Sequence, residues 1–285
     1  MYPPVATKDP AAVAVEVQAA WLAIFPDGDK VFVPRAFDWA KDCFAGNCRD
    51  YQPVDAPYHD FEHTLQGTLC MARLLRGRHQ TGKRPRLTRK MFKLGLLAIL
   101  LHDTGYLKKR NDTAGTGAKY TVTHVDRSAK FAAELLAEKG FSADDIKVVG
   151  NMIRCTGVDA ALNVIPFKGE VEKMVGFALG TADLLGQMAA EDYVEKLPVL
   201  YAEFAEAAAF SKDKTHFVAM YSSVADLMQK TPTFWEKFVQ QKLERDFGAL
   251  YRFLNDPYPD GPNEYLQRIE ANMDRLRRRL ATAPA

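Results

Sequence analysis

Histidine and aspartate residues that could bind a metal ion occur in four short segments of this chain. They are the run YHDFEH at residues 58–63, the pair His102 and Asp103, His124, and Asp183 within GTADLLG. Only six histidines occur among the 285 residues, and four of them lie in these segments. Mixed imidazole and carboxylate ligands suit zinc, iron or manganese, whereas oxygen ligands alone favour magnesium or calcium. We therefore expect one metal site assembled from distant parts of the chain.

The surroundings of these residues favour the same interpretation. His59 and His63 are four residues apart where the chain enters a helix, so both imidazoles can face the same way. Asp103 and Asp183 follow or interrupt strongly apolar segments, where an unpaired carboxylate is costly and metal coordination would remove that cost. Taken singly, each motif also fits an ordinary helix face or helix end, so the combination predicts the metal site.

The order of these motifs resembles that of the HD superfamily of metal-dependent phosphohydrolases. In particular, YHDFEHT is similar to the YHNxxHA motif of the class I cyclic nucleotide phosphodiesterases, and the resemblance covers nearly half of the chain, from Tyr58 to Gln187. It implies a first metal ion held by four residues: His63, His102, Asp103 and Asp183. It also implies that His59 donates a proton to the leaving oxygen and that Asp103 bridges to a second ion.

His124 and Arg154 are candidates for contacts to a second metal ion or to a substrate phosphate. His124 could instead form a hydrogen bond to Asp103 and orient it. Arg154 stands where some HD proteins have another histidine, and a guanidinium there favours a phosphate over a second cation.

Three further residues are expected to contact the substrate: Lys108, Arg127 and Gln187. If His59 is the proton donor, its ring needs a partner that holds it in place. Asp60 and Glu62 are the candidates that lie close to it in the sequence.

The resemblance implies metal-assisted hydrolysis of a phosphoester. One transition metal such as zinc, iron or manganese, and a second ion, magnesium or manganese, would activate water and neutralise charge on the phosphoryl oxygens. A cyclic-nucleotide-type phosphodiester is the favoured substrate. A nucleotidase or dNTP phosphohydrolase, and a non-catalytic HD protein that binds a nucleotide, are the alternatives. The chain has HDTGYLKKRNDTAGTG where the phosphodiesterases have a further histidine-containing loop, so the substrate stays open.

Composition and charge agree with an enzyme of the cytoplasm. The net charge is +2, and the basic run at residues 76–90 contains no interleaved aromatic residues, so no nucleic-acid partner is expected. The start of the chain does not resemble a signal peptide, and the apolar run at 94–101 is too short to cross a membrane. Cys43 and Cys48 could form a disulfide, but four free thiols in a reducing cytosol are favoured.

Almost every periodic segment of the chain favours a helix. We expect an all-α, phosphodiesterase-like helical bundle with one domain spanning residues 1–285, an HD-type core at 55–190, and flanking helices at 1–54 and 191–285. The predicted helices are 10–25, 35–45, 60–79, 88–103, 123–139, 142–155, 170–188, 191–209, 214–229, 231–254 and 262–281.

Overall fold

The computed structural model of the chain describes residues 2–48, 50–157, 160–211 and 217–282. Within these ranges it contains ten α-helices, short 3-10 and π-helical turns, and no β-strand beyond two isolated bridges. The all-α fold class predicted from the sequence is therefore confirmed. The helices are α1 (Pro10–Ile24), α2 (Phe32–Phe44), α3 (Phe61–Gln80), α4 (Arg89–Leu101), α5 (His124–Glu138), α6 (Ala143–Ile153), α7 (Glu170–Met188), α8 (Tyr193–Phe210), α9 (Val224–Phe234) and α10 (Glu264–Thr282).

Two of the three helices that provide metal-binding residues, α3 and α4, begin at polar capping side chains. Asp60 is the N-cap of α3, where its carboxylate accepts a hydrogen bond from the amide of His63 at 2.9 Å. Thr88 caps α4 in the same way through the amide of Met91 at 3.2 Å. Such caps satisfy backbone donors that have no partner inside the helix. They fix the position along the chain at which each helix starts.

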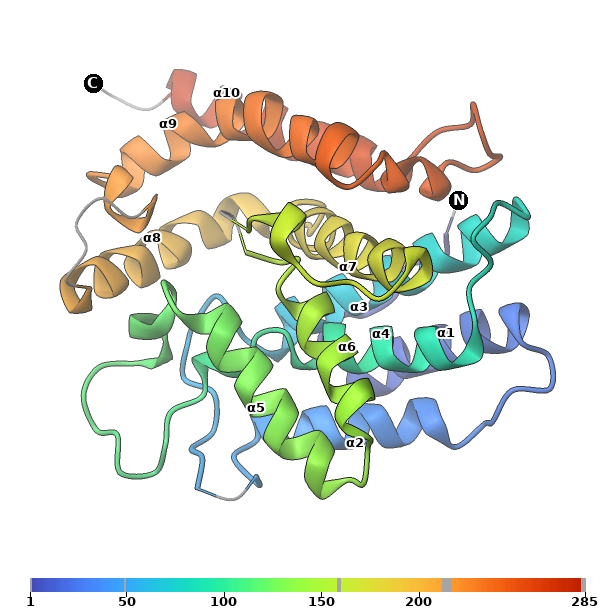
Figure 1. Cartoon of the computed structure of the whole chain (residues 1–285). Helices are drawn as coiled ribbons and strands as arrows, with labels where there is room; N and C mark the ends of the chain where they lie inside the picture. Colours follow the sequence, from blue (N-terminus) through green and yellow to red (C-terminus); the bar gives the residue numbers. More distant parts are fainter. Residues whose placement is uncertain (1, 49, 158–159, 212–216, 283–285) are drawn as a thin grey trace.

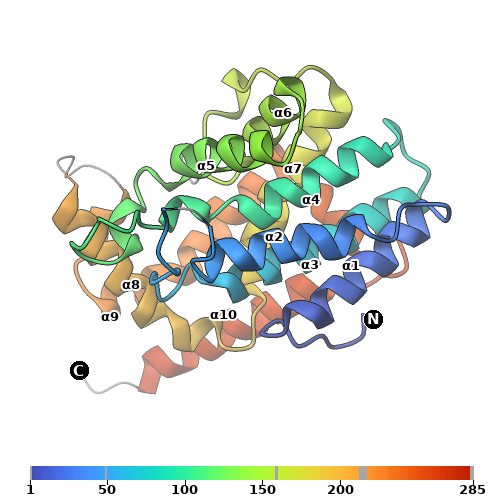
Figure 2. The same ribbon diagram turned by 90° about the horizontal axis from the view of Figure 1, so that it is seen from below.

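Helices α3 and α7 form the centre of the molecule (Figure 1). Helices α1 and α2 lie on one side of them and α9 and α10 on the other, while α5 and α6 form a further layer along the edge, as both views show (Figures 1 and 2). One apolar core runs through these layers, from Val13 in α1 to Leu276 in α10. The predicted metal-binding residues His63 and Asp183 therefore lie on the two most central helices.

The crossing of α3 and α7 depends on a glycine. A Cβ atom at Gly186 would lie 2.7 Å from the amide nitrogen of Gly67 and 2.8 Å from the carbonyl oxygen of Gln66, so the two backbones are nearly in contact. This crossing lies close in sequence to His63 on α3 and Asp183 on α7. The close approach of the two helices therefore sets the distance between these two side chains.

The segment after α8 differs most from the expected helices. Part of the predicted helix 214–229 lies outside the described residues, and α9 begins only at Val224. The break expected near residue 230 is wrong, because α9 continues through Pro232 to Phe234. The predicted helix 231–254 is also wrong as a regular helix: π-helical turns follow at Trp235–Val239 and Lys242–Asp246, and a 3-10 turn at Leu250–Leu254. Proline cannot donate a hydrogen bond to the carbonyl four residues earlier, which disturbs the α-helical register.

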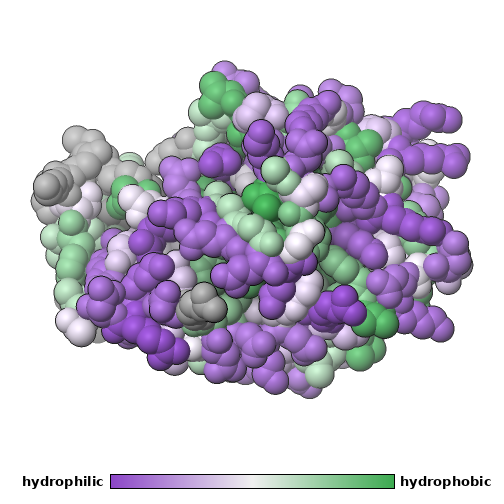
Figure 3. Space-filling model, turned by 60° about the horizontal axis from the view of Figure 1, so that its bottom comes forward, coloured by the Kyte–Doolittle hydropathy of each residue, from purple (hydrophilic) through white to green (hydrophobic). Residues whose placement is uncertain are grey.

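Hydrophilic side chains dominate the face shown in Figure 3, and the hydrophobic residues on it form small separate groups. The large apolar side chains that are exposed are scattered along the chain: Val15, Val31, Val164, Phe210, Met220 and Tyr258. None of the helices in the described part of the chain is long and apolar enough to cross a membrane.

The glycine at the helix crossing gives a first prediction. Gly186→Ala should destabilise the protein by about 1–3 kcal/mol, because the added methyl group forces two backbones apart. Gly67→Ala is the matched control on the opposite helix, since its Cβ would meet its nearest neighbour, the Ile99 side chain, at 3.4 Å. That variant should be neutral or slightly stabilising, because alanine favours helix. Thermal unfolding of both variants tests this, and equal stability of the two would contradict the account of the crossing.

Candidate metal centre

Four of the predicted ligands meet in one buried cluster. The Nε2 atom of His63 lies 3.2 Å from Oδ2 of Asp103 and 3.3 Å from Oδ1 of Asp183. The Nε2 atom of His102 lies 3.3 Å from each of the same two oxygens. Nitrogen and oxygen atoms thus alternate around a ring, and all four residues are buried. Even without Asp183, the three residues His63, His102 and Asp103 form a group that could hold a metal ion.

The spacing within this ring is the spacing of metal ligands. Atoms about 2.1 Å from a common ion lie about 3.0–3.4 Å apart in octahedral or tetrahedral geometry. In addition, Nε2 of His102 and Oδ2 of Asp103 are fully buried and have no hydrogen-bond partner among the described residues. Buried polar atoms are rarely left without a partner, and a divalent ion would satisfy both of these atoms. The residues present therefore fit a transition metal ion.

The orientation of His102 is set by its own helix. Its Nδ1 atom lies 2.6 Å from the carbonyl oxygen of Ile99, which can only accept a hydrogen bond. The proton must therefore be on Nδ1, and Nε2 is left free to face the two carboxylates. This arrangement is typical of histidines that bind metal ions through one nitrogen.

The charges of the cluster compensate one another. Burial by itself would lower the pKa of His63, but the adjacent Asp103 and Asp183 carboxylates raise it to about 10. Burial also lowers the pKa of His102, but the same two carboxylates raise it by more, so the net shift is upward. In turn, the two histidines outweigh burial and hold the pKa of Asp103 and of Asp183 well below the usual range. Without a metal ion, the carboxylates are thus paired with imidazolium groups.

His59 lies beside the cluster, and its partner is a residue that the sequence did not indicate. Its Nδ1 atom is 2.5 Å from Oε2 of Glu203, which is 1% exposed. The other oxygen of Glu203 accepts hydrogen bonds from the backbone amides of Tyr58 at 2.7 Å and of His59 at 3.3 Å. Glu203 therefore fixes both the ring and the backbone of the YHDFEH segment. The signal available in the sequence was an acidic residue on the apolar face of α8, next to Phe204 and Ala207.

Neither expected partner of His59 contacts it through a hydrogen bond. Asp60 is the cap of α3, as described above. Glu62 accepts hydrogen bonds from Lys196 at 3.0 Å and from Thr7 at 3.2 Å. Both side chains are held by other groups, because neighbours in sequence at the start of a helix point in different directions.

His124 reaches the other side of Asp103. Its Nε2 atom lies 4.0 Å from Oδ1 of Asp103, and its Nδ1 atom lies 2.6 Å from the carbonyl oxygen of Thr121. Burial lowers the pKa of His124, which favours the neutral ring that a metal ion requires. The ring of Tyr106, also unforeseen from the sequence, packs against both imidazoles, with its centroid 4.8 Å from that of His124 and 4.4 Å from that of His59.

The glycine of HDTG has a steric role in this arrangement. A Cβ atom at Gly105 would collide with the backbone carbonyl of His124. The amide of Gly105 also donates a hydrogen bond to the hydroxyl of Ser128 at 2.8 Å. The start of α5 can therefore approach the loop after Asp103 only where that loop has no side chain.

Of the other predicted site residues, only Gln187 lines the pocket beside the cluster. Its amide oxygen accepts a hydrogen bond from the hydroxyl of Tyr58 at 3.0 Å. Lys108 instead pairs with Asp55 at 2.8 Å and donates to the carbonyl of Gly115 at 2.7 Å. It lies outside this pocket.

The two predicted arginines also lie outside the pocket. Arg127 donates to the carbonyl oxygens of Gly105 at 2.7 Å and Leu107 at 2.8 Å, so it supports the loop after Asp103. The side chain of Arg154 is 46% exposed and faces Asp126, with 3.6 Å between Nε and Oδ1. The structure does not bring either guanidinium to the cluster.

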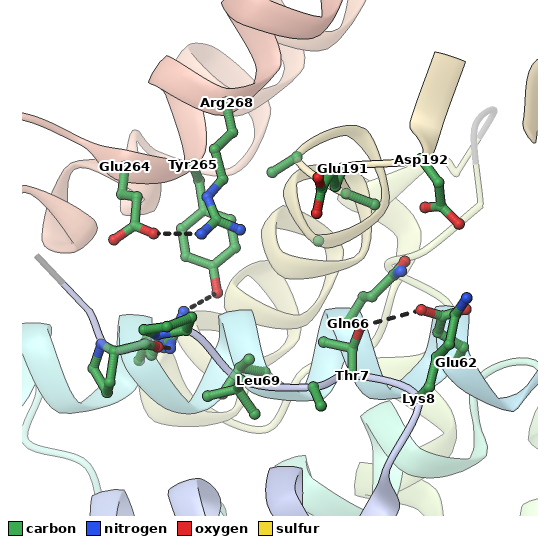
Figure 4. A pocket seen from close by; sticks show the side chains of 18 of the residues that line it. Thr7, Lys8, Glu62, Gln66, Leu69, Glu191, Asp192, Glu264, Tyr265 and Arg268 are labelled. Atoms are coloured by element: carbon green, nitrogen blue, oxygen red, sulfur yellow. Dashed lines mark hydrogen bonds and ion pairs between the residues drawn. The ribbon is translucent and has the colours of Figure 1, made fainter. Parts of the chain in front are cut away.

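A pocket of about 130 Å³ opens directly onto the cluster, with His59, Asp103, His124 and Asp183 in its wall. A larger and more polar hollow of about 540 Å³ lies on another face of α3 (Figure 4). Figure 4 shows Gln66 extending into it from α3 and Arg268 reaching toward it from α10. In the part of the chain that the structure describes, the only group with the spacing of metal ligands is the one at the smaller pocket.

These observations define an all-α protein with a buried histidine and aspartate cluster that could hold a metal ion. The Npun_R2479-like family matches residues 109–252, which are 144 of the 285 residues, and the chain belongs to this family. The matched segment includes His124, Asp183 and Glu203, whereas His63 and Asp103 precede it. No match to the chain was found among curated proteins.

The cluster predicts metal binding by the purified protein. We expect about one tightly bound zinc, iron or manganese ion per chain, and His63→Ala or Asp103→Ala should weaken binding by at least about 100-fold, since outer-sphere partners alone contribute 10–100-fold. His79→Ala is the control, because His79 lies on the same helix but is exposed. Elemental analysis and metal titration provide the measurement. Equal metal content in all four proteins would contradict the site.

Metal affinity should rise with pH. In the metal-free protein the raised pKa of His63, about 10, keeps this ring protonated at neutral pH, and the resulting stabilisation is complete below about pH 6.5 and is lost as the pH rises toward 10. Metal binding requires the neutral ring and must expel the proton, so affinity should increase about tenfold per pH unit for each proton released. Competition with a chromophoric chelator between pH 6 and 9 measures this slope. A flat profile would contradict the assignment, and His63→Gln should show a smaller slope than the wild type.

Proposed function

We propose that the protein is a metal-dependent phosphohydrolase related to the HD superfamily. The observation that carries the proposal is the ring of two imidazoles and two carboxylates, with a third histidine beside it that is held by a buried glutamate. A divalent ion bound by His63, His102, Asp103 and Asp183 would activate water and neutralise charge on phosphoryl oxygens. The order of the motifs in the sequence supports the same class of enzyme.

In this proposal His59 is the general acid. Because Nδ1 of His59 faces Glu203, the other ring nitrogen is available to a substrate in the pocket. A proton on that nitrogen can be delivered to the leaving oxygen as its bond to phosphorus breaks. Glu203 is the positioning residue, because its carboxylate holds the ring and carries the charge opposite to that of imidazolium.

A second ion belongs to the proposal as well. His124 and the outer oxygen of Asp103 face each other at 4.0 Å, a separation into which a second cation with additional water ligands fits. Arg154 is 46% exposed and does not line the pocket, so its guanidinium does not take the place of that ion. Magnesium or manganese is the expected metal, since few protein ligands and several waters suit these ions.

Phosphodiesters, including cyclic-nucleotide-type substrates, are the proposed substrate class, as the YHDFEH segment suggests. A nucleotidase or dNTP phosphohydrolase would use the same residues on a linear phosphate. A cytoplasmic location is proposed because the chain has only four cysteines and none of them has CxxC spacing. A panel of cyclic nucleotides, generic phosphodiesters and nucleoside mono- and triphosphates separates these activities by their products.

The roles of His59 and Glu203 can be tested by comparing metal content with turnover. His59→Ala should keep its metal and its fold but lose about 10²-fold or more in kcat, the usual contribution of a general acid. Glu203→Gln should also retain metal and lose part of this activity, because a neutral amide still contacts the ring but cannot balance a positive charge. The measurement is kcat on a phosphodiester with a poor leaving group, together with elemental analysis.

A substrate with a p-nitrophenolate leaving group provides the control for both variants. That group departs without a proton, so the loss of activity in His59→Ala should shrink on it. If His59→Ala instead loses metal to the same extent as His63→Ala, His59 is a ligand and the division of roles is wrong.

A further inference from the structure

The pocket beside the cluster has walls of opposite character. His59, Asp103 and Asp183 form one side. The side formed by α8 and α9 is mostly apolar, with Tyr193 and Thr231 as its hydroxyl-bearing residues and five apolar ones: Leu197, Leu200, Phe204, Leu227 and Phe234. None of the four metal-binding candidates comes from α8 or α9, although Glu203 of α8 holds the YHDFEH segment. The contribution of these two helices to the pocket is therefore a surface against which part of a ligand can pack.

The threonine hydroxyls and the Gln187 amide that reach this pocket already have partners, whereas the buried hydroxyl of Tyr106 has none among the described residues. The hydroxyls of Thr121, Thr156 and Thr231 donate to carbonyl oxygens of their own helices or turns, at 2.7, 2.9 and 2.8 Å. The amide oxygen of Gln187 accepts from Tyr58 at 3.0 Å. A ligand group with several donors and acceptors would lose its hydrogen bonds to water here and regain few of them. An apolar group has no hydrogen bonds to water to lose.

The volume sets an upper limit on the size of that group. The pocket holds about 130 Å³. An engineered apolar cavity of about 150 Å³ in another protein binds benzene, whereas sites for larger ligands occupy about 300–1,000 Å³. A single aromatic ring or a short branched alkyl group fits inside this space, whereas a nucleoside would extend out of it.

We propose that the substrate is a phosphoester with one small apolar group, of about the size of a phenyl ring, which packs against Leu200, Phe204 and Phe234 while the phosphoryl group faces the cluster. The inference rests on the proposed function and narrows it from whole nucleotides to smaller organic phosphates. In the reaction, the oxygen of water bonds to phosphorus and one proton of that water passes to the solvent. The bond between phosphorus and the ester oxygen breaks, the ester oxygen leaves with the electron pair, and His59 gives that oxygen a proton, which the ring regains from solvent. No oxidant or reductant is needed.

Binding of non-hydrolysable phosphonates to the metal-loaded protein tests the inference without relying on turnover. Phenylphosphonate should bind at least about tenfold more tightly than methylphosphonate, because a buried ring gains more from leaving water than a methyl group does. Thymidine 5′-monophosphate should bind no more tightly than methylphosphonate. Isothermal titration with all three compounds gives the comparison. Equal affinity for phenyl- and methylphosphonate, or tighter binding of the nucleotide, would overturn the inference.

Variants of the apolar wall locate the effect. Phe234→Ala should reduce the preference for phenylphosphonate about fivefold or more, with methylphosphonate binding unchanged within about twofold. Leu200→Asn should act in the same direction, and because Leu200 is only half-buried this variant is expected to fold. Phe210→Ala is the matched control, since Phe210 lies on α8 but is 51% exposed and outside the pocket. If the control changes the preference as much as Phe234→Ala, the apolar wall is not the determinant.

Two further measurements distinguish this inference from ligand binding in the polar hollow and from failure of the proposed function. Arg268→Ala, in the polar hollow of Figure 4, should leave phosphonate binding unchanged, and a loss of binding would place the ligand there instead and overturn the inference. Activity on bis(p-nitrophenyl) phosphate, measured in parallel, tests the proposed function itself. Hydrolysis without a preference for the phenyl group would overturn the inference alone. A clear preference without hydrolysis of any phosphoester would support the apolar pocket and reject the phosphohydrolase.

Discussion

Two buried carboxylates, Asp103 and Asp183, impose the strongest constraint on this fold. A charged carboxylate inside an apolar helical core is strongly unfavourable unless opposite charges or a metal ion surround it. His63 and His102 supply that compensation at 3.2–3.3 Å, and their four side chains come from α3, the end of α4, and α7. The cluster therefore requires these three helices to meet at one point. Many of the other contacts described above hold the three helices in this arrangement.

The supporting contacts are steric as much as electrostatic. Gly186 allows α7 to lie directly on the backbone of α3, and Gly105 allows the start of α5 to approach the loop that follows Asp103. Arg127 then holds that loop through two backbone carbonyls. Residues that looked like substrate contacts because they are basic are thus used, in part, to position the backbone around the cluster. Positive charge near a predicted site does not distinguish these two uses.

The pocket combines functions that come from different parts of the chain. Its polar side comes from the segments at the start of α3, after α4, at the start of α5 and within α7, whereas its apolar side belongs to α8 and α9. Helix α8 also provides Glu203. The family match covers α8 and α9 together with Asp183, but begins after the first three metal-binding candidates. Helix α8 connects the two sides, because it orients His59 through Glu203 and contributes Leu200 and Phe204 to the apolar wall.

The sequence by itself determined the helical class, because hydrophobic periodicity is a local signal. It also indicated the residues of the cluster, because histidines are scarce and stand in or beside apolar segments, and because their order resembles that of the HD superfamily. It placed most helices well up to the end of α8. It could not determine the irregular path after Pro232, where the loss of one backbone donor changes the helical register. Nor could it determine the pairing of His59 with Glu203, which are 144 positions apart, or show that Lys108 and Arg154 point elsewhere. Those features depend on which helix faces meet, and that is decided only when the whole core packs.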